Sequence, residues 1–461
     1  MRAGRRRRDE ETKGRSDEVT ERRRDEVTKG RSDEVTERRR DEETKRRSDG
    51  ETKGRRDEGT KGRRDEEKKK LMANRIAAFL ILVILIPFEG ICSDTSIRRK
   101  AIKVLRTEII ARADKVLYEK PVTITSFYCE RSAGGIHDFY SEGDYWWPDP
   151  ENPEGPYIQR DGMSNPGNFT EHRKAMIRLS RITGLLASAY TITGDEKYVQ
   201  QAFLHLSAWF ADTATLMNPS LLFAQAIKGR FTGRGTGIID TIHLMEVARS
   251  IQAMENAGCV DKKLIETIKS WFTSYLEWLM THQYGIDEMN TKNNHATCWV
   301  MQVAAFARLT GDEKILEFCR DRYREILLPG QMAEDGSFPL ELKRTKPYGY
   351  SLFNLDAMAM VCIILSDENN DLINYQTPDG KSLRKGIEFL YPYVTDKTGW
   401  TYNKDVMYWD EWPVAHPFLL FGAGSFGIRP WYNTWKKLDH FPANEEVIRN
   451  LPVRNPVIWF D

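Results

Sequence analysis

Two stretches of the sequence share one layout: LLASAYTITGDEK at residues 185–197 and VAAFARLTGDEK at residues 303–314. In each, a run of small and apolar residues suits a helix, and a TGDEK turn leads into a second helical run. Gly194 and Gly311 can adopt the left-handed backbone that ends a helix, and the aspartate after each glycine can cap the next one. Both stretches therefore predict a hairpin of two antiparallel helices.

The helical period of 3.6 residues continues through much of the chain, whereas few runs alternate as strands do. The other helical stretches are 101–117, 198–210, 239–257, 262–282, 315–328, 350–365 and 382–394. A chain of this length exceeds the usual size of a single core unless it is built as a repeat or a toroid. We therefore expect an all-α fold, an incomplete (α/α) toroid or barrel of antiparallel helical hairpins, with long loops over a cleft.

The longest predicted loop, residues 132–168, contains SAGGIHDFYSEGDYWWPDPENPEGPYIQRDG and is polar, aromatic and rich in glycine and proline. Loops of this length within a compact domain usually carry function. Aromatic side chains can form platforms for sugar rings, although any one of them is more often part of a core. The aromatic residues considered for this role are Tyr145, Trp146, Trp147, Trp409 and Trp412.

The first part of the chain has a different composition from the rest. Residues 1–71 hold 27 of the 69 Lys and Arg residues and 21 of the 68 Asp and Glu residues, which leaves 42 basic and 47 acidic residues elsewhere. That mildly acidic remainder requires no nucleic-acid partner. Residues 6–69 form eight charged octads such as RRRDEETK with almost no apolar side chains, so we expect residues 1–71 to be disordered. Acidic residues in every octad argue against an arm that binds nucleic acid or anionic lipid.

A basic stretch, an apolar run at residues 76–88 and short side chains up to Cys92 have the layout of a signal peptide. The apolar run is too short to span a bilayer comfortably. Because a signal sequence normally begins a chain, we hypothesise that Met72 is the natural start and that the octads are an upstream extension. We expect a signal peptide or membrane anchor at 72–92, a domain at 93–461, and a secreted or periplasmic protein with no stable membrane association after cleavage. The alternative is a protein anchored through the apolar run.

The clearest candidate for chemistry is Asn293-Asn294-His295, which ends a polar turn at residues 287–292 and opens an apolar helix at 296–309. A helix N-terminus favours a substrate carboxylate. An asparagine amide can donate to that carboxylate, and a histidine can take or give a proton near neutral pH. The alternative is that Asn294 only caps the helix and that His295 is a structural histidine.

A second candidate is KRTKPYGYSLFN at residues 343–354, in which three cations and two tyrosines precede a helix. Tyr350 and Asn354 fall on one face of that helix. A nearby cation favours tyrosinate, so a tyrosine here can serve as a base or an acid, and Arg344 can hold a carboxylate in its fork. The alternative is an aromatic side chain packed on the core with cations on the surface around it. Further candidates for substrate contact in this segment are Lys346 and Tyr348.

A third candidate is the glycine-rich segment AQAIKGRFTGRGTGIIDTIH at residues 224–243. It resembles a phosphate-binding loop only superficially, because no GKS or GKT follows and no strand precedes it. Arginines in a glycine-rich loop ahead of a helix suit the carboxylates of uronate sugars better. The candidates for substrate binding here are Gln225, Arg230, Arg234 and His243.

Four stretches together resemble the alginate lyase domain family, α/α-toroid polysaccharide lyases that act on uronate polymers. They are GDYWWPDP with GPYIQRDG, AQAIKGRFTGRGTGIIDT, NNHATCW and KRTKPYGYSLFNLDA, and the resemblance spans residues 126–426. In that family an Asn-His pair and a downstream Arg and Tyr form the catalytic centre. By motif these roles fall on Asn294, His295, Arg344 and Tyr350.

The resemblance implies β-elimination from an anionic polysaccharide, alginate or a related polyuronate. Asn294 and Arg344 would neutralise the uronate carboxylate, so that a base can remove the C5 proton while an acid protonates the departing O4. For mannuronate Tyr350 would do both, and for guluronate His295 would be the base and Tyr350 the acid. The spacing from Arg344 departs from the best-known branch of the family, so Tyr348 is the alternative catalytic tyrosine.

No cofactor is expected and no metal, because no residues have the spacing of metal ligands and the five cysteines after Cys92 fit no disulfide framework. Two other classes stay open from the sequence: a glycoside hydrolase on the same toroid and a non-catalytic glycan-binding protein. A hydrolase needs two carboxylic acids that flank the scissile bond. The acids available for that role are Asp240, Asp335, Asp410 and Glu411.

Overall fold

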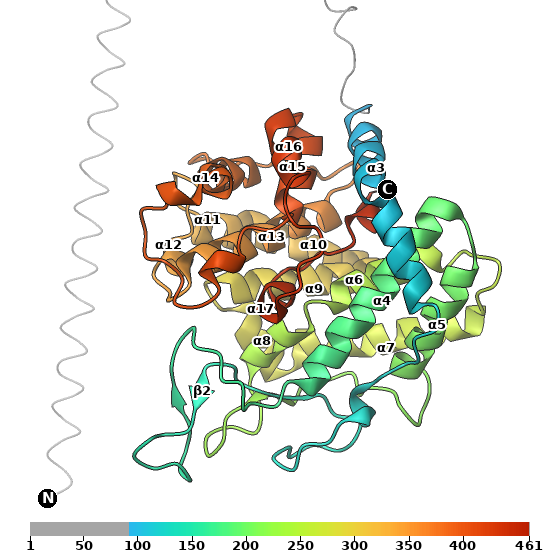
Figure 1. The fold of residues 1–461 in the computed structure, drawn as a ribbon, viewed down its shortest axis with the longest axis vertical. Helices are drawn as coiled ribbons and strands as arrows, with labels where there is room; N and C mark the ends of the chain where they lie inside the picture. Colours follow the sequence, from blue (N-terminus) through green and yellow to red (C-terminus); the bar gives the residue numbers. More distant parts are fainter. Residues whose placement is uncertain (1–91, 461) are drawn as a thin grey trace, which may run out of the picture. The chain divides into compact units, whose positions relative to one another are not determined.

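The computed structural model describes residues 92–460, which form a body built mainly of helices with little sheet (Figure 1). The longer helices before residue 311 are α3 (Cys92–Val116), α4 (Glu171–Thr193), α5 (Lys197–Phe210), α6 (Leu244–Met254), α7 (Lys262–Thr281), α8 (Gln283–Met289) and α9 (Asn294–Thr310). Those after it are α10 (Glu313–Arg322), α11 (Leu328–Gln331), α12 (Pro339–Leu342), α13 (Pro347–Leu365), α14 (Leu383–Thr395), α15 (Pro417–Phe426), α16 (Arg429–Trp435) and α17 (Glu445–Arg449). Short helical turns are η1 (Ile124–Ser126), η2 (Gly235–Thr241), η3 (Tyr323–Leu327), η4 (Lys397–Gly399), η5 (Trp409–Glu411) and η6 (Pro456–Trp459).

The predominance of helix confirms the predicted fold class in its coarse form. The octads of residues 1–71 and the signal-peptide layout up to residue 91 lie outside the described residues. The division of the chain into three parts at 72 and 93 therefore stays a prediction.

Both TGDEK turns lie between two helices, as the sequence predicts. Gly194 ends α4 with φ 72° and Gly311 ends α9 with φ 77°, so both glycines have the left-handed backbone. Asp312 accepts a hydrogen bond from the backbone N–H of Ile315 and caps α10, whereas Asp195 bonds within the turn before α5. Neighbours in sequence pack together, α4 on α5 and α9 on α10.

Several helix boundaries differ from those predicted. The predicted helix at 239–257 is divided into η2 and α6, and the one at 315–328 into α10 and the wider turn η3. The predicted polar turn at 287–292 is wrong in its first half, because α8 continues to Met289. Helix α13 begins three residues earlier than expected, at Pro347. Proline suits the first position of a helix, because a backbone N–H at that position would have no partner within the helix.

Helices α9 and α13 pack against each other at the centre of the core. Helix α9 also contacts α6, α7, α8 and α10, while α13 contacts α12, α14 and α15. Among the described helices, α13 is the one long and apolar enough to cross a membrane, and 94% of its apolar window is buried within the protein. Because both helices are enclosed by others, the side chains at their first turns are held in fixed positions.

Two small sheets organise the long loop and the glycine-rich segment. Strand β1 (Tyr140–Glu142) pairs in parallel with β4 (Phe223–Ala226), and β2 (Trp146–Trp147) pairs with β3 (Ile158–Gln159) in an antiparallel hairpin. Figure 1 shows β2 and its hairpin at the lower left, below α8 and α12. The β1–β4 pairing brings together two segments that the sequence separately assigns to sugar binding.

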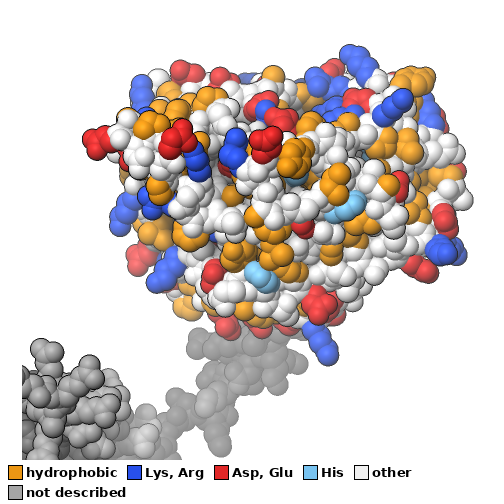
Figure 2. All heavy atoms as spheres, turned by 90° about the horizontal axis from the view of Figure 1, so that it is seen from below, with side chains coloured by type: hydrophobic (Ala, Val, Ile, Leu, Met, Phe, Trp, Pro, Cys, Tyr) orange, Lys and Arg blue, Asp and Glu red, His pale blue; other side chains and the backbone are white. Residues whose placement is uncertain are grey.

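The face of the protein seen in Figure 2 has basic, acidic and apolar side chains interspersed, without a broad region of one charge. Attraction of a charged polymer to this face would therefore depend on local groups of cations. This face has no extended region of a single charge that could attract such a polymer over a long range.

Replacing Gly311 with alanine should lower the free energy of unfolding by about 1–2 kcal/mol, because a Cβ is unfavourable in the left-handed backbone. No other atom lies within 4 Å of the added Cβ, so the cost comes from the backbone alone. Gly330 in α11 is the matched control, because its added Cβ also meets nothing and its φ is not positive. Urea unfolding should show Gly311→Ala destabilised and Gly330→Ala unchanged or slightly stabilised. Equal effects of the two substitutions would contradict this account.

Candidate active site

His295 lies at the start of α9 and is oriented by a buried carboxylate. Its Nδ1 lies 2.5 Å from Oε1 of Glu288 near the end of α8, and its own side chain is 20% exposed. The other oxygen of Glu288 is buried and has no hydrogen-bond partner among the residues of the described body. A carboxylate only accepts hydrogen bonds, so Nδ1–H is the donor of this pair, and in the neutral imidazole Nε2 is then the acceptor. The neutral form of the histidine thus offers Nε2 as a general base.

Asn294 is buried, and a second carboxylate fixes its side chain. The backbone N–H donates to Oε1 of Glu341 at 2.7 Å, and Nδ2 donates to Oε2 at 2.8 Å. Burial raises the pKa of Glu341, although the bonds from Asn294 and the charge of Arg344 oppose the rise. The amide therefore has one N–H committed to Glu341 and one hydrogen and its oxygen left for another partner.

Tyr350 lies in the first turn of α13 between another tyrosine and two cations. Its side chain is mostly covered, at 7% exposed, and its hydroxyl donates to that of Tyr145 at 2.8 Å. The guanidinium of Arg344 lies 4.5 Å from the ring centroid and Nζ of Lys346 lies 5.3 Å from it. Burial raises the pKa of Tyr350 well above its ordinary value, Tyr145 raises it further, and Arg344 lowers it. The resting side chain is therefore a protonated hydroxyl.

The fork of Arg344 is occupied by a carboxylate from the long loop. Nη2 lies 2.8 Å from Oδ1 of Asp161 and Nε lies 3.3 Å from Oδ2, while the hydroxyl of Thr345 donates to Oδ2 at 2.9 Å. Burial opposes ionisation of Asp161, but the bonds from Arg344 lower its pKa overall. A substrate carboxylate would have to displace Asp161 from this fork or bind another cation.

Gln331 connects the first turn of α9 with the second turn of α13. Its Oε1 accepts from the hydroxyl of Thr297 at 2.9 Å and from Nδ2 of Asn354 at 3.0 Å. Its Nε2 donates to the carbonyl of Asn293 at 2.9 Å. Asn354 lies four residues after Tyr350, and Thr297 lies three residues after Asn294, which is about one helical turn in each case. One side chain therefore links the N-terminal parts of the two helices.

The glycine-rich segment contributes a cation that has no acidic hydrogen-bond partner among residues 92–460. Arg234 donates to the carbonyl of Gln225 at 3.0 Å and to its Oε1 at 2.9 Å, and lies 5.9 Å from the ring centroid of Trp146. Gln225 itself has φ 49°, which is uncommon for a residue with a side chain. Burial lowers the pKa of Arg234, while the charges of Asp240 and Glu288 act in the opposite direction. A partly buried guanidinium bonded only to a neutral amide can still take a carboxylate.

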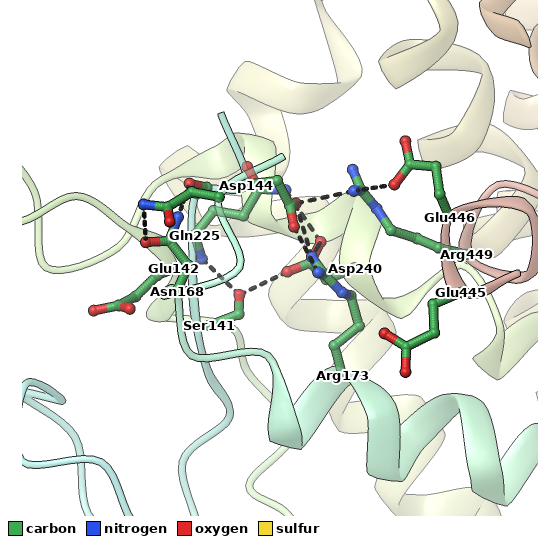
Figure 3. A network of polar contacts seen from close by, with 12 residues as sticks. Ser141, Glu142, Asp144, Asn168, Arg173, Gln225, Asp240, Glu445, Glu446 and Arg449 are labelled. Carbon is green, nitrogen blue, oxygen red and sulfur yellow. Dashed lines mark hydrogen bonds and ion pairs between the residues drawn. The ribbon is translucent and has the colours of Figure 1, made fainter. Parts of the chain in front are cut away.

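Behind this segment lies a buried network of ion pairs, shown in Figure 3. Asp144 accepts from Arg173 at 2.6 and 2.8 Å, and Arg173 also reaches Asp240 at 3.2 Å. Arg449 pairs with Asp144 at 3.2 Å and with Glu446 at 3.0 Å. Each charge in the network has an opposite partner, which burial requires. The network joins the long loop to α4 and α17.

Three residues predicted to contact substrate are buried. His243 bonds through Nε2 to a backbone carbonyl of α17 at 3.1 Å, and burial lowers its pKa. Tyr348 is fully buried, and its hydroxyl donates to the carbonyl of Tyr393 at 3.1 Å. Lys346 is buried in an ion pair with Glu446. The structure thus gives all three packing and charge-pairing contacts within the protein.

The tryptophans predicted as sugar platforms have different surroundings. The guanidinium of Arg230 lies 5.5 Å from the ring centroid of Trp146 in β2, and that of Arg234 is also near this ring. Trp147 donates through Nε1 to the carbonyl of Met163 at 2.8 Å. Trp409 packs on the ring of Tyr348 at 5.4 Å, within a group of aromatic side chains. Trp146 is therefore the platform that stands next to a candidate cation.

Within residues 92–460, no group of three or more His, Cys, Asp or Glu side chains is arranged to hold a metal ion. The prediction that no metal is used stays a prediction.

Asp405 should titrate near pH 6, because burial raises the pKa of its carboxyl to about 6 from the ordinary 3.8, against two backbone N–H donors at the start of α13. The folded protein then holds this proton at a higher pH than the unfolded chain. Its contribution to stability is present below pH 3.8 and is lost as the pH rises through about 6.

The stability of Asp405→Asn relative to the natural protein should therefore rise across this pH range in urea unfolding, and the carboxyl 13C resonance of Asp405 should move with a midpoint near 6. A midpoint near the ordinary value would contradict the effect of burial.

Comparison with known proteins places these features in a family. The family model described as alginate lyase matches residues 123–400. An alginate lyase from Bacteroides ovatus of solved structure is 30% identical, with 80% of this chain and 97% of that chain covered and a TM-score of 0.69. Alginate lyase A1-III from Sphingomonas species A1 is 15% identical over 69% of this chain and 87% of that one, with a TM-score of 0.46. A variant of A1-III complexed with a tetrasaccharide is 14% identical over 69% of this chain and 86% of that one, with a TM-score of 0.47. Among curated proteins, no significant match was found.

The family model covers more than half of the chain, and the match to the Bacteroides ovatus enzyme includes nearly all of that protein. The assignment therefore rests on the helical body as a whole and on the segments that carry the candidate site, and a single short motif does not decide it. The chain belongs to the alginate lyase family and is a polysaccharide lyase.

Proposed function

We propose that this lyase cleaves alginate or a related polyuronate by β-elimination. The observation that supports the proposal most strongly is the link that Gln331 makes between the first turn of α9 and the second turn of α13. One start carries an oriented histidine, and the other carries a tyrosine against two cations. The proposed centre consists of His295, Tyr350, Asn294 and Arg344.

Neutralisation of the sugar carboxylate is the first requirement, because the C5 proton of a uronate is poorly acidic beside a free carboxylate. Arg344 can exchange Asp161 for the substrate, since both partners are carboxylates and suit the same planar fork. Asn294 has an amide hydrogen beyond the one used by Glu341. Arg234 is a further guanidinium for this purpose. Such donors stabilise the negative charge that develops when the proton leaves.

Proton transfer then requires a base at C5 and an acid at O4. His295 has Nε2 available, and the raised pKa of Tyr350 keeps its hydroxyl protonated. These resting states suit the guluronate case, in which His295 is the base and Tyr350 the acid. In the mannuronate case Tyr350 must first lose its proton, and the cations of Arg344 and Lys346 against its ring favour that loss.

The remaining proposals concern architecture and location. We propose that the helices form an incomplete α/α toroid of antiparallel hairpins, as the packing of successive helices and the likeness to the Bacteroides ovatus enzyme support. The signal-peptide layout at residues 72–92 supports a secreted or periplasmic protein, with membrane anchoring through residues 76–88 as the alternative.

Incubation with a panel of alginate, glucuronan and other uronate polymers tests the proposed reaction. β-Elimination leaves a C4–C5 double bond at the new end, which absorbs in the near ultraviolet. We expect that absorbance to grow with alginate or a closely related polyuronate. Cleavage that yields only saturated ends would contradict the proposal.

Tyr350→Phe should abolish the formation of unsaturated ends, whereas Tyr348→Phe should keep most of it. The reason is that the hydroxyl of Tyr350 lies among the proposed catalytic groups, while that of Tyr348 bonds to a backbone carbonyl within the core. Initial rates of absorbance change measure both variants, and circular dichroism confirms that they fold. The reverse outcome would transfer the catalytic role to Tyr348.

Glu288→Gln should lower kcat by about 10- to 100-fold with little change in KM, as part of the roughly 10²–10⁴-fold that a positioned acid or base contributes. The neutral amide no longer stabilises the imidazolium or fixes the proton on Nδ1 of His295. Nitrogen-15 NMR of His295 should show the altered tautomer. Glu266→Gln on the exposed side of α7 is the matched control. Unchanged kcat and tautomer in Glu288→Gln would refute this positioning role.

A further inference from the structure

A cavity of about 760 Å³ lies beside the candidate site, and none of the proposed catalytic residues lines it. Its walls are the first half of α4, the short helix α17, the end of the long loop at residues 164–170, and Met407 with Tyr408. Figure 3 shows the ion pairs that separate this region from the glycine-rich segment. The cavity is large enough to hold more than a single small ion.

Tyr408 connects the cavity to the candidate site. Its ring centroid lies 5.3 Å from Nζ of Lys346, and the same Nζ lies 5.3 Å from the ring centroid of Tyr350. Tyr408 also has φ 64°, a left-handed backbone that costs energy in a residue with a side chain and is often retained at functional positions. One lysine therefore separates the cavity wall from the proposed catalytic tyrosine.

Positive charge predominates in the lining. Arg173 and Arg449 are already paired with Asp144 and Glu446 in the network of Figure 3. After these pairs are removed from the lining, Glu445 is the remaining acid. The remaining cations are Lys174, Arg178, Arg181 and Arg454.

These remaining cations are only partly compensated. Lys174 lies 3.5 and 3.6 Å from two exposed glutamates, and exposed pairs of this kind contribute little. Arg178 and Arg181 share the single carboxylate of Glu119. Arg454 donates to a backbone carbonyl at 3.0 Å, and its Nε is buried without a hydrogen-bond partner in the described structure. Burial lowers the pKa of Arg454, while the charge of Glu246 acts in the opposite direction.

The start of α4 adds to this preference for anions. Thr170 occupies the position before the helix but makes no side-chain bond to its free N–H groups. Thr170 lines the cavity together with Arg173 and Lys174 from the first turn. The positive end of a long helix dipole therefore points to the same space as the cations.

We infer that this cavity binds the part of a polyuronate chain that continues beyond the bond being cleaved. The inference rests on the proposed function and names a second place where the same substrate is held. Each successive sugar carries a carboxylate, which matches the surplus of cations and the helix start. The ring of Tyr408 offers a surface for a sugar at the entrance. A longer chain would consequently bind more tightly than a short one.

A graded series of alginate oligosaccharides tests this inference, with kcat and KM measured from the absorbance of the unsaturated ends. In the natural protein KM should fall as the chain lengthens. Lys174→Glu should raise KM for the longest oligomers about tenfold, with the increase growing with chain length, because a favourable charge becomes a repulsive one. Lys174→Gln should give a smaller change in the same direction. Lys262→Glu at the exposed start of α7, outside the cavity, is the matched control.

The outcomes separate this inference from the proposed function. Equal rises in KM at all chain lengths, or an equal effect of Lys262→Glu, would overturn the cavity assignment and leave the cleavage reaction standing. If the natural protein forms no unsaturated ends from any uronate polymer, both proposals are wrong. A rise in KM that grows with chain length in the Lys174 variants, is absent from Lys262→Glu and weakens at high salt would support the cavity assignment.

Discussion

The amide of Gln331 joins the first turn of α9 to the second turn of α13, and the proposed catalytic side chains lie within about one turn of this link. Its oxygen accepts from Thr297 of α9 and Asn354 of α13, and its nitrogen donates to the carbonyl before α9. Buried polar groups are costly unless they are bonded, so this arrangement has few alternatives. Because α9 and α13 are enclosed by other helices, their first turns cannot move apart without disturbing the core.

Three carboxylates fix the positions of the proposed catalytic side chains. Glu288 orients His295, Glu341 fixes Asn294, and Asp161 occupies the fork of Arg344. These acids hold the functional groups in place, but their charges would repel an acidic sugar. The cations around the centre offset that repulsion, and the exchange of Asp161 for a substrate carboxylate would leave the local charge nearly unchanged. A polyanion can therefore bind at a site that contains several acids.

The sequence predicts much of the helical fold because period and turn chemistry are local. The TGDEK turns and the start of α9 follow from residues close together in the chain. Contacts between distant segments are not encoded in this way. Asp161 lies far from Arg344 in sequence, and the partnership of Glu341 with Asn294 also requires the folded chain.

The error at residues 287–292 had a related cause. That segment is polar, yet α8 continues through Glu288 because its carboxylate is buried against His295. Burial is equally hard to predict for aromatic and basic residues within a functional motif. Tyr348 and Tyr350 lie two residues apart, and their different hydroxyl partners, a backbone carbonyl and another tyrosine, emerge only from the structure. Of the acids considered for a hydrolase, Asp240 is buried and bonded to Ser141, Arg173 and Gln225. The other three, Asp335, Asp410 and Glu411, are exposed.

A crystal structure of the Tyr350→Phe variant with an alginate oligosaccharide would test the central claim most directly. The account predicts one sugar with C5 facing Nε2 of His295, O4 near the position of the missing hydroxyl, and its carboxylate on a guanidinium of Arg344 or Arg234. An oligosaccharide bound with no contact to His295 or to the ring at position 350 would contradict it.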